Sequence, residues 1–362
     1  MKRALSLMTA AFAGLGLLSA CAGAPPIARP AVPQSSEYAK APLRAGDGSE
    51  FITDYTKKLQ KALADDGKGL DEIQGGPMLD RTKAEVLVAK AEKKKLGTVG
   101  FDKVVAGGPK QSEYPLWFFA FANADDAESG TQALLVTRED ANSEWTVQQG
   151  LFIDPERVPN LALEDGQVAE AGKQYAVDFG KTVTAVKDYL SGAGKSGGGD
   201  SLDDFDLSGD GFKGYRDYVD EYAKDTKSFK RVESRCQPYT EIDFEKYAVK
   251  AEGGGAVSMA EMRCTITLEV PDDFNFTLPK QVSAITTGKK NGNRVEIEAS
   301  IPFLIETSKD KTKLTSPDWF PLSGKQTSAK GEGKNKSEDK GKDEGKDEGK
   351  GEGKSKDEGS GD

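Results

Sequence analysis

The chain has 362 residues, a formal net charge of -10 at pH 7 and a sequence pI near 5.0. This acidic balance gives no electrostatic support for a nucleic-acid partner, and we expect none. The sequence contains no His, which excludes Ser-His-Asp and Cys-His catalysis, His general bases and His-containing metal sites, but leaves carboxylate chemistry, Ser-Lys chemistry and oxygen-ligand calcium sites open.

The first twenty residues follow the order of regions in a secretory signal peptide. Lys2 and Arg3 precede an uncharged apolar run at 4–18, which is too short and too closely followed by polar chain for a stable membrane-spanning helix. The run ends in Leu18-Ser19-Ala20-Cys21, which resembles the bacterial lipobox. That resemblance implies that diacylglycerol alkylates the Cys21 thiol and that cleavage makes Cys21 the first residue of the mature chain.

A lipidated Cys21 would make a membrane the principal partner of the protein. Each buried methylene of an acyl chain contributes about 0.8 kcal/mol, so two chains give durable anchoring. We therefore expect residues 1–20 to be a lipoprotein signal peptide. We expect the mature protein to be lipid-anchored at the extracytoplasmic face of the cell membrane. A plain signal peptide with an incidental Cys is the alternative.

The other two cysteines, Cys236 and Cys264, form an even pair in an oxidising compartment. A disulfide across that separation would stabilise the fold by about 3–4 kcal/mol. The close C-x-x-C spacing of redox-active pairs is absent. We therefore predict a structural disulfide.

Composition divides the mature chain into a spacer, two folded domains and a tail. Residues 21–48 are rich in Pro and Ala, which favours an extended spacer. Residues 323–362 consist mainly of Lys, Glu, Asp, Gly and Ser, which predicts a disordered charged tail. The apolar periodic patterns lie between these ends, at 49–168 and 172–322.

Helical patterns precede strand patterns in residues 49–168. Apolar residues recur every four positions at 51–63, the spacing of one helix face, and a second helix is expected at 77–95. Strand-like runs follow at 99–105, 116–122, 131–138 and 145–153. This order predicts an antiparallel meander with two helices packed on one face.

The same order recurs in residues 172–322. Helical spacing is found at 175–190 and 215–222, and the turn at 207–211 matches the turn at 73–77. Strand-like runs lie at 229–236, 259–270 and 294–305, with an expected hairpin tip at Asn291-Gly292. We interpret the fold as α+β, with two tandem units, each of two helices packed on an antiparallel sheet.

The lipobox, Pro/Ala spacer, tandem units and charged tail together resemble uncharacterised lipoproteins of high-GC Gram-positive bacteria. The individual units resemble NTF2-like or cystatin-like folds, in which a sheet wraps on helices. This resemblance implies export and a surface role. The resemblance implies no catalytic residues, because a shared fold alone does not establish an activity.

One loop and two aromatic clusters are the strongest candidates for binding. Asp206, Ser208, Asp210 and Asp217 have the spacing of a calcium loop. Lys213 at a usually apolar position favours a turn and helix cap instead, so we assign no metal ligand and leave calcium binding open. The aromatic clusters at 114–119 and 317–321 are either sheet core or pocket wall.

The sequence shows no nucleophile–base set, and we assign no catalytic residue, cofactor or metal. We expect a lipid-anchored extracytoplasmic protein with a non-catalytic binding or cell-envelope accessory role. Its partner would be an envelope protein or a small-molecule ligand. Two alternatives stay open: a carboxylate-dependent envelope hydrolase, which needs two acidic side chains facing a cleft, and a purely structural spacer protein.

Overall fold

The computed structural model describes residues 42–328, apart from 45, 98–99, 126–129, 196–200, 244–245, 289–290 and 309. These residues fall within one compact unit, Ala39–Asp362. Cys21, the signal peptide, most of the spacer and the tail from 329 onward lie outside the described residues. The fold is mixed α+β. Among the described helices, none has the length and apolar character needed to cross a membrane.

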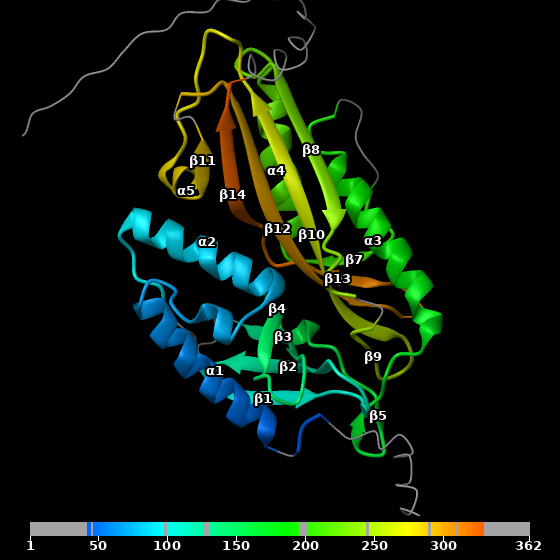
Figure 1. The fold of residues 1–362 in the computed structure, drawn as a ribbon. Helices are drawn as coiled ribbons and strands as arrows, with labels where there is room; N and C mark the ends of the chain where they lie inside the picture. The colour runs from blue at the N-terminus through cyan, green and yellow to red at the C-terminus, as the bar shows by residue number, and fades with distance from the viewer. Residues whose placement is uncertain are drawn as a thin grey trace, which may run out of the picture. The chain divides into compact units, whose positions relative to one another are not determined.

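The N-terminal half contains two helices and a four-stranded sheet. Helices α1 (Asp47–Ala64) and α2 (Gly76–Glu92) precede strands β1 (Phe101–Gly107), β2 (Leu116–Ala124), β3 (Thr131–Arg138) and β4 (Thr146–Ile153). The strands are antiparallel and lie in the order β1-β2-β3-β4 (Figure 1). Both helices and all four strands occur where the sequence patterns predicted them, with small shifts at their ends.

Local sequence sets the ends of the two helices. Asp47 and Glu50 occupy the first turn of α1, where acidic side chains compensate the positive end of the helix dipole. Pro77 lies in the first turn of α2, where a missing N–H costs no helical hydrogen bond. α2 ends at Glu92 and not at the expected Lys95, because Lys93 adopts a left-handed conformation with φ 60°.

The C-terminal half contains two long helices and a larger sheet. Helices α3 (Ala176–Ser191) and α4 (Gly211–Lys224) precede the antiparallel strands β8 (Arg231–Pro238), β10 (Ala256–Glu269), β12 (Arg294–Glu306) and β14 (Phe320–Thr327). Shorter elements complete this half: β7 (Asp206–Ser208), β9 (Ala248–Lys250), α5 (Lys280–Ala284), β11 (Thr286–Gly288) and β13 (Lys313–Thr315). Between the halves lie β5 (Leu163–Glu164), β6 (Gln167–Val168) and the 3-10 helices Pro155–Arg157 and Lys173–Tyr175. A further 3-10 helix, Leu70–Glu72, lies between α1 and α2.

The first sheet packs on both of its faces. Successive side chains of a strand point to opposite faces. Phe118 of β2 therefore packs with Ile52 and Tyr55 of α1, whereas Trp117 points the other way and packs with Met259 of β10. The first sheet thus lies between the α1 side and one end of the second sheet.

The second sheet alternates in the same way. Ala260, Met262 and Cys264 of β10 pack with Phe179 of α3 and Tyr215 of α4 in the largest apolar cluster. The opposite face of β10 meets the first sheet at one end. The layers therefore run from α1 and α2, through the two sheets, to α3 and α4 (Figure 1).

Two predictions for the C-terminal half are wrong. Asn291-Gly292 is not a hairpin tip, because the long connection from β10 to β12 contains α5 and β11, and β11 pairs in parallel with β14. Residues 323–327, expected in the tail, belong to β14 and pair with β12. Gln326 stabilises this extension, because its side-chain amide donates to the backbone carbonyl of Gly292 at 3.0 Å.

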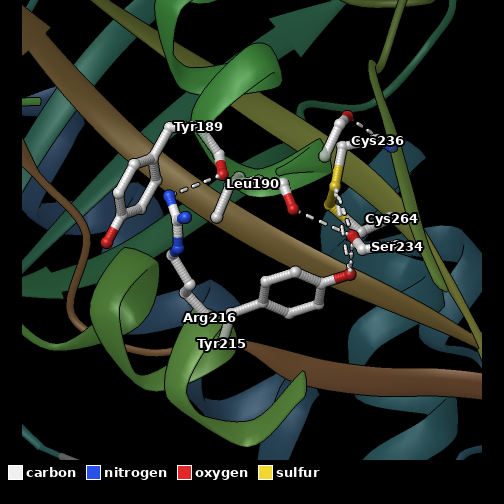
Figure 2. Close-up of a disulfide and its surroundings, with 8 residues drawn as sticks. Tyr189, Leu190, Tyr215, Arg216, Ser234, Cys236 and Cys264 are labelled. Atoms are coloured by element: carbon white, nitrogen blue, oxygen red, sulfur yellow. Dashed lines mark hydrogen bonds between the residues drawn. A yellow bond between two sulfur atoms is a disulfide. The ribbon is translucent and has the colours of Figure 1, made fainter. Parts of the chain in front are cut away.

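The predicted disulfide is present between Cys236 and Cys264, which lie directly opposite each other on β8 and β10. Both side chains are buried beneath α3 and α4. Figure 2 shows that the Tyr215 hydroxyl, 2.7 Å from the hydroxyl of Ser234, approaches the disulfide from α4. Ser234 in turn donates to the Leu190 carbonyl of α3 at 2.9 Å. The disulfide therefore joins two strands at the point where both helices contact them.

Removing the disulfide should destabilise the protein. In a Cys21→Ser background, the double variant Cys236→Ala/Cys264→Ala should lose about 3–4 kcal/mol of unfolding free energy, because its unfolded chain is no longer constrained. Urea denaturation followed by circular dichroism measures this loss. Reduction of the parent should shift its midpoint in the same direction, and an unchanged midpoint in both experiments would contradict a structural role.

Candidate functional site

A cavity of about 180 Å³ lies between α1, α2 and the helix-facing side of the first sheet. Apolar side chains form most of its wall: Leu59 and Leu63 from α1, Met78 from α2, Phe101 from β1 and Phe152 from β4. An engineered apolar cavity of roughly 150 Å³ accommodates benzene. The space is therefore large enough for a small organic molecule.

A glycine leaves part of this space open. Gly150 of β4 has its missing side chain on the helix-facing side, where a Cβ would lie 2.7 Å from Cδ2 of Leu134 and 3.3 Å from the sulfur of Met78. A larger residue could not enter without moving these neighbours. Gly150 therefore permits the close approach of α2 to the sheet and lines the cavity with backbone.

Two polar side chains also line the cavity without hydrogen-bond partners among the described residues. Gln132 of β3 is 8 % exposed and Thr82 of α2 is 4 % exposed. Neither side chain forms a hydrogen bond with the described part of the chain. By contrast, Thr182, which is buried on α3, donates to the backbone carbonyl of Asp178. Neither residue has an atom among the fully buried polar atoms that lack a partner, so their polar groups are open to the cavity. A molecule that supplied a partner would gain about 0.5–1.5 kcal/mol per hydrogen bond.

The charged groups at the cavity wall satisfy one another. Arg81 of α2 donates to both carboxylate oxygens of Asp318 at 3.0 and 2.7 Å, and its Nε donates to Glu85 at 2.9 Å. Burial opposes the charge of Arg81, but the hydrogen bonds and charges of Asp318 and Glu85 outweigh burial and raise the pKa of the guanidinium. The single cation of the wall is thus shared by two carboxylates, so these three groups leave an excess of negative charge.

Glu85 and Asp318 are the carboxylates that line this cavity. A glycosidase-type mechanism requires two carboxyl groups that face a substrate across open space. Here Arg81 binds both carboxylates, which is the arrangement of an ion-pair network. The geometry therefore favours binding over carboxylate-dependent hydrolysis in this cavity.

A second charge network lies on the neighbouring face of α2. Asp80 accepts a hydrogen bond from Arg263 of β10 at 3.0 Å, and Arg263 Nε lies 2.6 Å from Glu261 Oε1. The guanidinium of Arg263 also stacks 5.0 Å from the ring centroid of Tyr239. Burial raises the pKa of Glu261 to about 7, although Arg263 acts in the opposite direction. This network links α2 to the second sheet.

The structure separates the side chains of the segment that has calcium-loop spacing. Asp206 pairs with Arg157 at 2.7 Å, and Asp217 pairs with Lys213 along α4. Asp210 precedes α4 without the expected side-chain cap. Across the described ranges, no group of three or more His, Cys, Asp or Glu side chains is placed to hold a metal ion.

The aromatic clusters divide between core and cavity. Trp117 and Phe119 are core residues, and Trp319 packs on Tyr215 and Tyr218 of α4. Pro317 and Asp318, from the second of these clusters, line the cavity. The sequence analysis did not select Gln132, Thr82 or Arg81. A signal existed for Gln132, because it is a polar residue within an otherwise apolar strand pattern.

Glu261 should make stability depend on pH. Its pKa is 4.5 when unperturbed and about 7 in the fold, so the folded state holds the proton more tightly between these values. Stability should therefore be full below pH 4.5 and fall as pH rises through 7, by an amount on the order of 3 kcal/mol. Glu261→Gln, which stays neutral, should remove this decline in urea denaturation. A parent curve that rises over the same window would contradict the assignment.

Comparison with known proteins places the chain in a family without an assigned activity. Residues 46–302 match the family described as Domain of unknown function (DUF8094). No curated protein and no solved structure matches the chain. The match includes α1 to α4, the disulfide-bonded Cys236 and Cys264, and the cavity residues of α1, α2 and the first sheet. Because it extends over most of the sequence, the chain belongs to the DUF8094 family.

Proposed function

We propose that this protein is a lipid-anchored extracytoplasmic binding protein that holds a small-molecule ligand in the cavity between α1, α2 and the first sheet. The role is accessory and non-catalytic. The observation that carries the proposal is the cavity itself, with its apolar walls and the two buried polar side chains of Gln132 and Thr82. Ligand sites in proteins combine these same features.

The sequence of the N-terminus supports the proposed location. The lipobox Leu18-Ser19-Ala20-Cys21 provides a lipidation site, and residues 21–48 provide a spacer between the membrane and the folded chain. Lipidation at Cys21 would leave Cys236 and Cys264 free to pair, and an oxidising compartment favours the disulfide that joins them. A cavity in the folded part would then meet ligands outside the cytoplasm.

We also propose that the two halves are diverged copies of one helix-helix-sheet unit, related to NTF2-like or cystatin-like folds. Each half has two helices followed by an antiparallel meander, β1-β2-β3-β4 in one and β8-β10-β12-β14 in the other. In each, the turn before the second helix pairs in parallel with another segment, but the partners differ. Gln74 forms an isolated bridge with Val147 of β4, whereas β7 pairs with β13, which lies outside the meander. The shared order of elements is therefore the main support for duplication.

Replacing the lipidated residue should release the protein from membranes. Cys21→Ser removes the thiol on which lipidation depends, so the chain should move from the membrane pellet to the soluble fraction after cell fractionation. Ser36→Ala, which leaves the lipobox intact, is the matched control and should stay in the pellet. Retention of Cys21→Ser in the membrane fraction would show that the anchoring mechanism is wrong.

A ligand should copurify with the protein. Native mass spectrometry of the full Cys21→Ser chain, purified without denaturant, should show an additional non-covalent mass. Thr82→Met extends a side chain into the cavity and should remove that mass, whereas Thr184→Met, on the exposed side of α3, should retain it. A ligand-free mass for the parent, or equal retention in both variants, would contradict binding at this site.

A further inference from the structure

We infer the chemical class of the ligand: a small, uncharged and mainly apolar molecule that carries one hydrogen-bonding group, which Gln132 binds. This inference rests on the proposed binding function and adds a ligand class to it. Three properties of the cavity support it: the mutual pairing of its charged groups, the position of its unpartnered polar groups and its size.

The charged groups of the wall argue against an ionised ligand. An anion would need a cation, but Arg81 already donates three hydrogen bonds to Asp318 and Glu85, and these two carboxylates would repel the anion. A cation would need a carboxylate, and both of these carboxylates are engaged by Arg81. Binding either ion would require this network to open, which would take partners away from the guanidinium of Arg81, only 19 % exposed. A neutral molecule leaves the network intact.

The polar groups specify where the ligand forms a hydrogen bond. Gln132 lies on β3 opposite Phe152 of β4, and both side chains face the helices. A primary amide donates and accepts, so it can bind a hydroxyl or a carbonyl. Thr82 contributes a hydroxyl from the α2 side of the same cavity. A polar group on the ligand would thus find a partner in the amide of Gln132.

The remaining surface matches an apolar body. Leu59, Leu63, Met78 and Phe101 surround the rest of the space. Burial of apolar surface contributes roughly 25 cal/mol per Å², so this part of the ligand would supply most of the affinity. The flexible Met78 can adapt to ligands of different shape. The cavity volume of about 180 Å³ limits the ligand to a small molecule.

Three matched probes test this class: p-cresol, toluene and p-toluate. They share a methyl-substituted ring and carry a hydroxyl, no polar group or a carboxylate. Binding to the full Cys21→Ser chain is measured by titration of the ¹³C-labelled methyl resonance of Met78, which Met78→Leu identifies. We expect p-cresol to bind about 2- to 10-fold more tightly than toluene, the range of one net hydrogen bond, and p-toluate to bind more weakly than both.

The variant Gln132→Leu assigns the hydrogen bond. It keeps an apolar side chain of similar size, so toluene should bind at least as well as before, and the preference for p-cresol should fall by the same factor of about 2 to 10. The control is Thr182→Val, which removes a buried hydroxyl from α3, distant in sequence from the cavity residues. This variant should leave the preference for p-cresol over toluene unchanged.

The outcomes separate the ligand class from the binding function. Tighter binding of p-toluate than of p-cresol would overturn the uncharged class, but a copurified ligand lost in Thr82→Met would still support binding in the cavity. Equal affinities for p-cresol and toluene, or an unchanged preference in Gln132→Leu, would overturn the role of Gln132. Failure of all three probes to shift the Met78 resonance would overturn the proposed class.

Discussion

Two adjacent residues on α2 connect this helix by ion pairs to the C-terminal half of the fold. Successive residues of a helix project about 100° apart, so neighbours in sequence can bind different partners. Asp80 pairs with Arg263 of β10, whereas Arg81 pairs with Asp318 in the segment before β14. Both partners lie in the C-terminal half, although α2 packs on β4 of the first sheet. α2 is therefore fixed over the junction, and the cavity beneath it depends on that position.

The second sheet can meet α2 because its outer face changes character along one strand. On that face of β10, Val257 and Met259 pack against the first sheet, and Glu261 and Arg263 lie in the charged network that reaches α2. Thr265, farther along, lines a polar groove. Burial of Glu261 is costly unless its charge is paired or lost. The raised pKa of Glu261 is thus a consequence of burying a carboxyl next to the apolar contact with the first sheet.

Much of the fold could be predicted because its main elements have strong local patterns. β3 spans 131–138, as predicted, since its continuous apolar run and flanking turns define both ends. The short strands β7, β9, β11 and β13 were missed because each contains three residues and is defined by pairing with a distant segment. Gln326 was placed in the tail for the same reason. Its burial depends on Gly292, which no local pattern could reveal.

The site was harder to predict because it is defined by what surrounds each residue. A Gln in a strand is ordinarily a solvent-facing residue, and the burial of Gln132 becomes evident only once α1 and α2 cover the helix-facing side of β3. In the N-terminal half alone, Arg81 would pair with Glu85 only. Asp318 lies beyond residue 302, where the family match ends, and places a second carboxylate on the same guanidinium. An anion in the cavity would therefore meet a repulsion that the first half alone does not provide. A residue near the end of the second half thus contributes to the selectivity of a site built in the first.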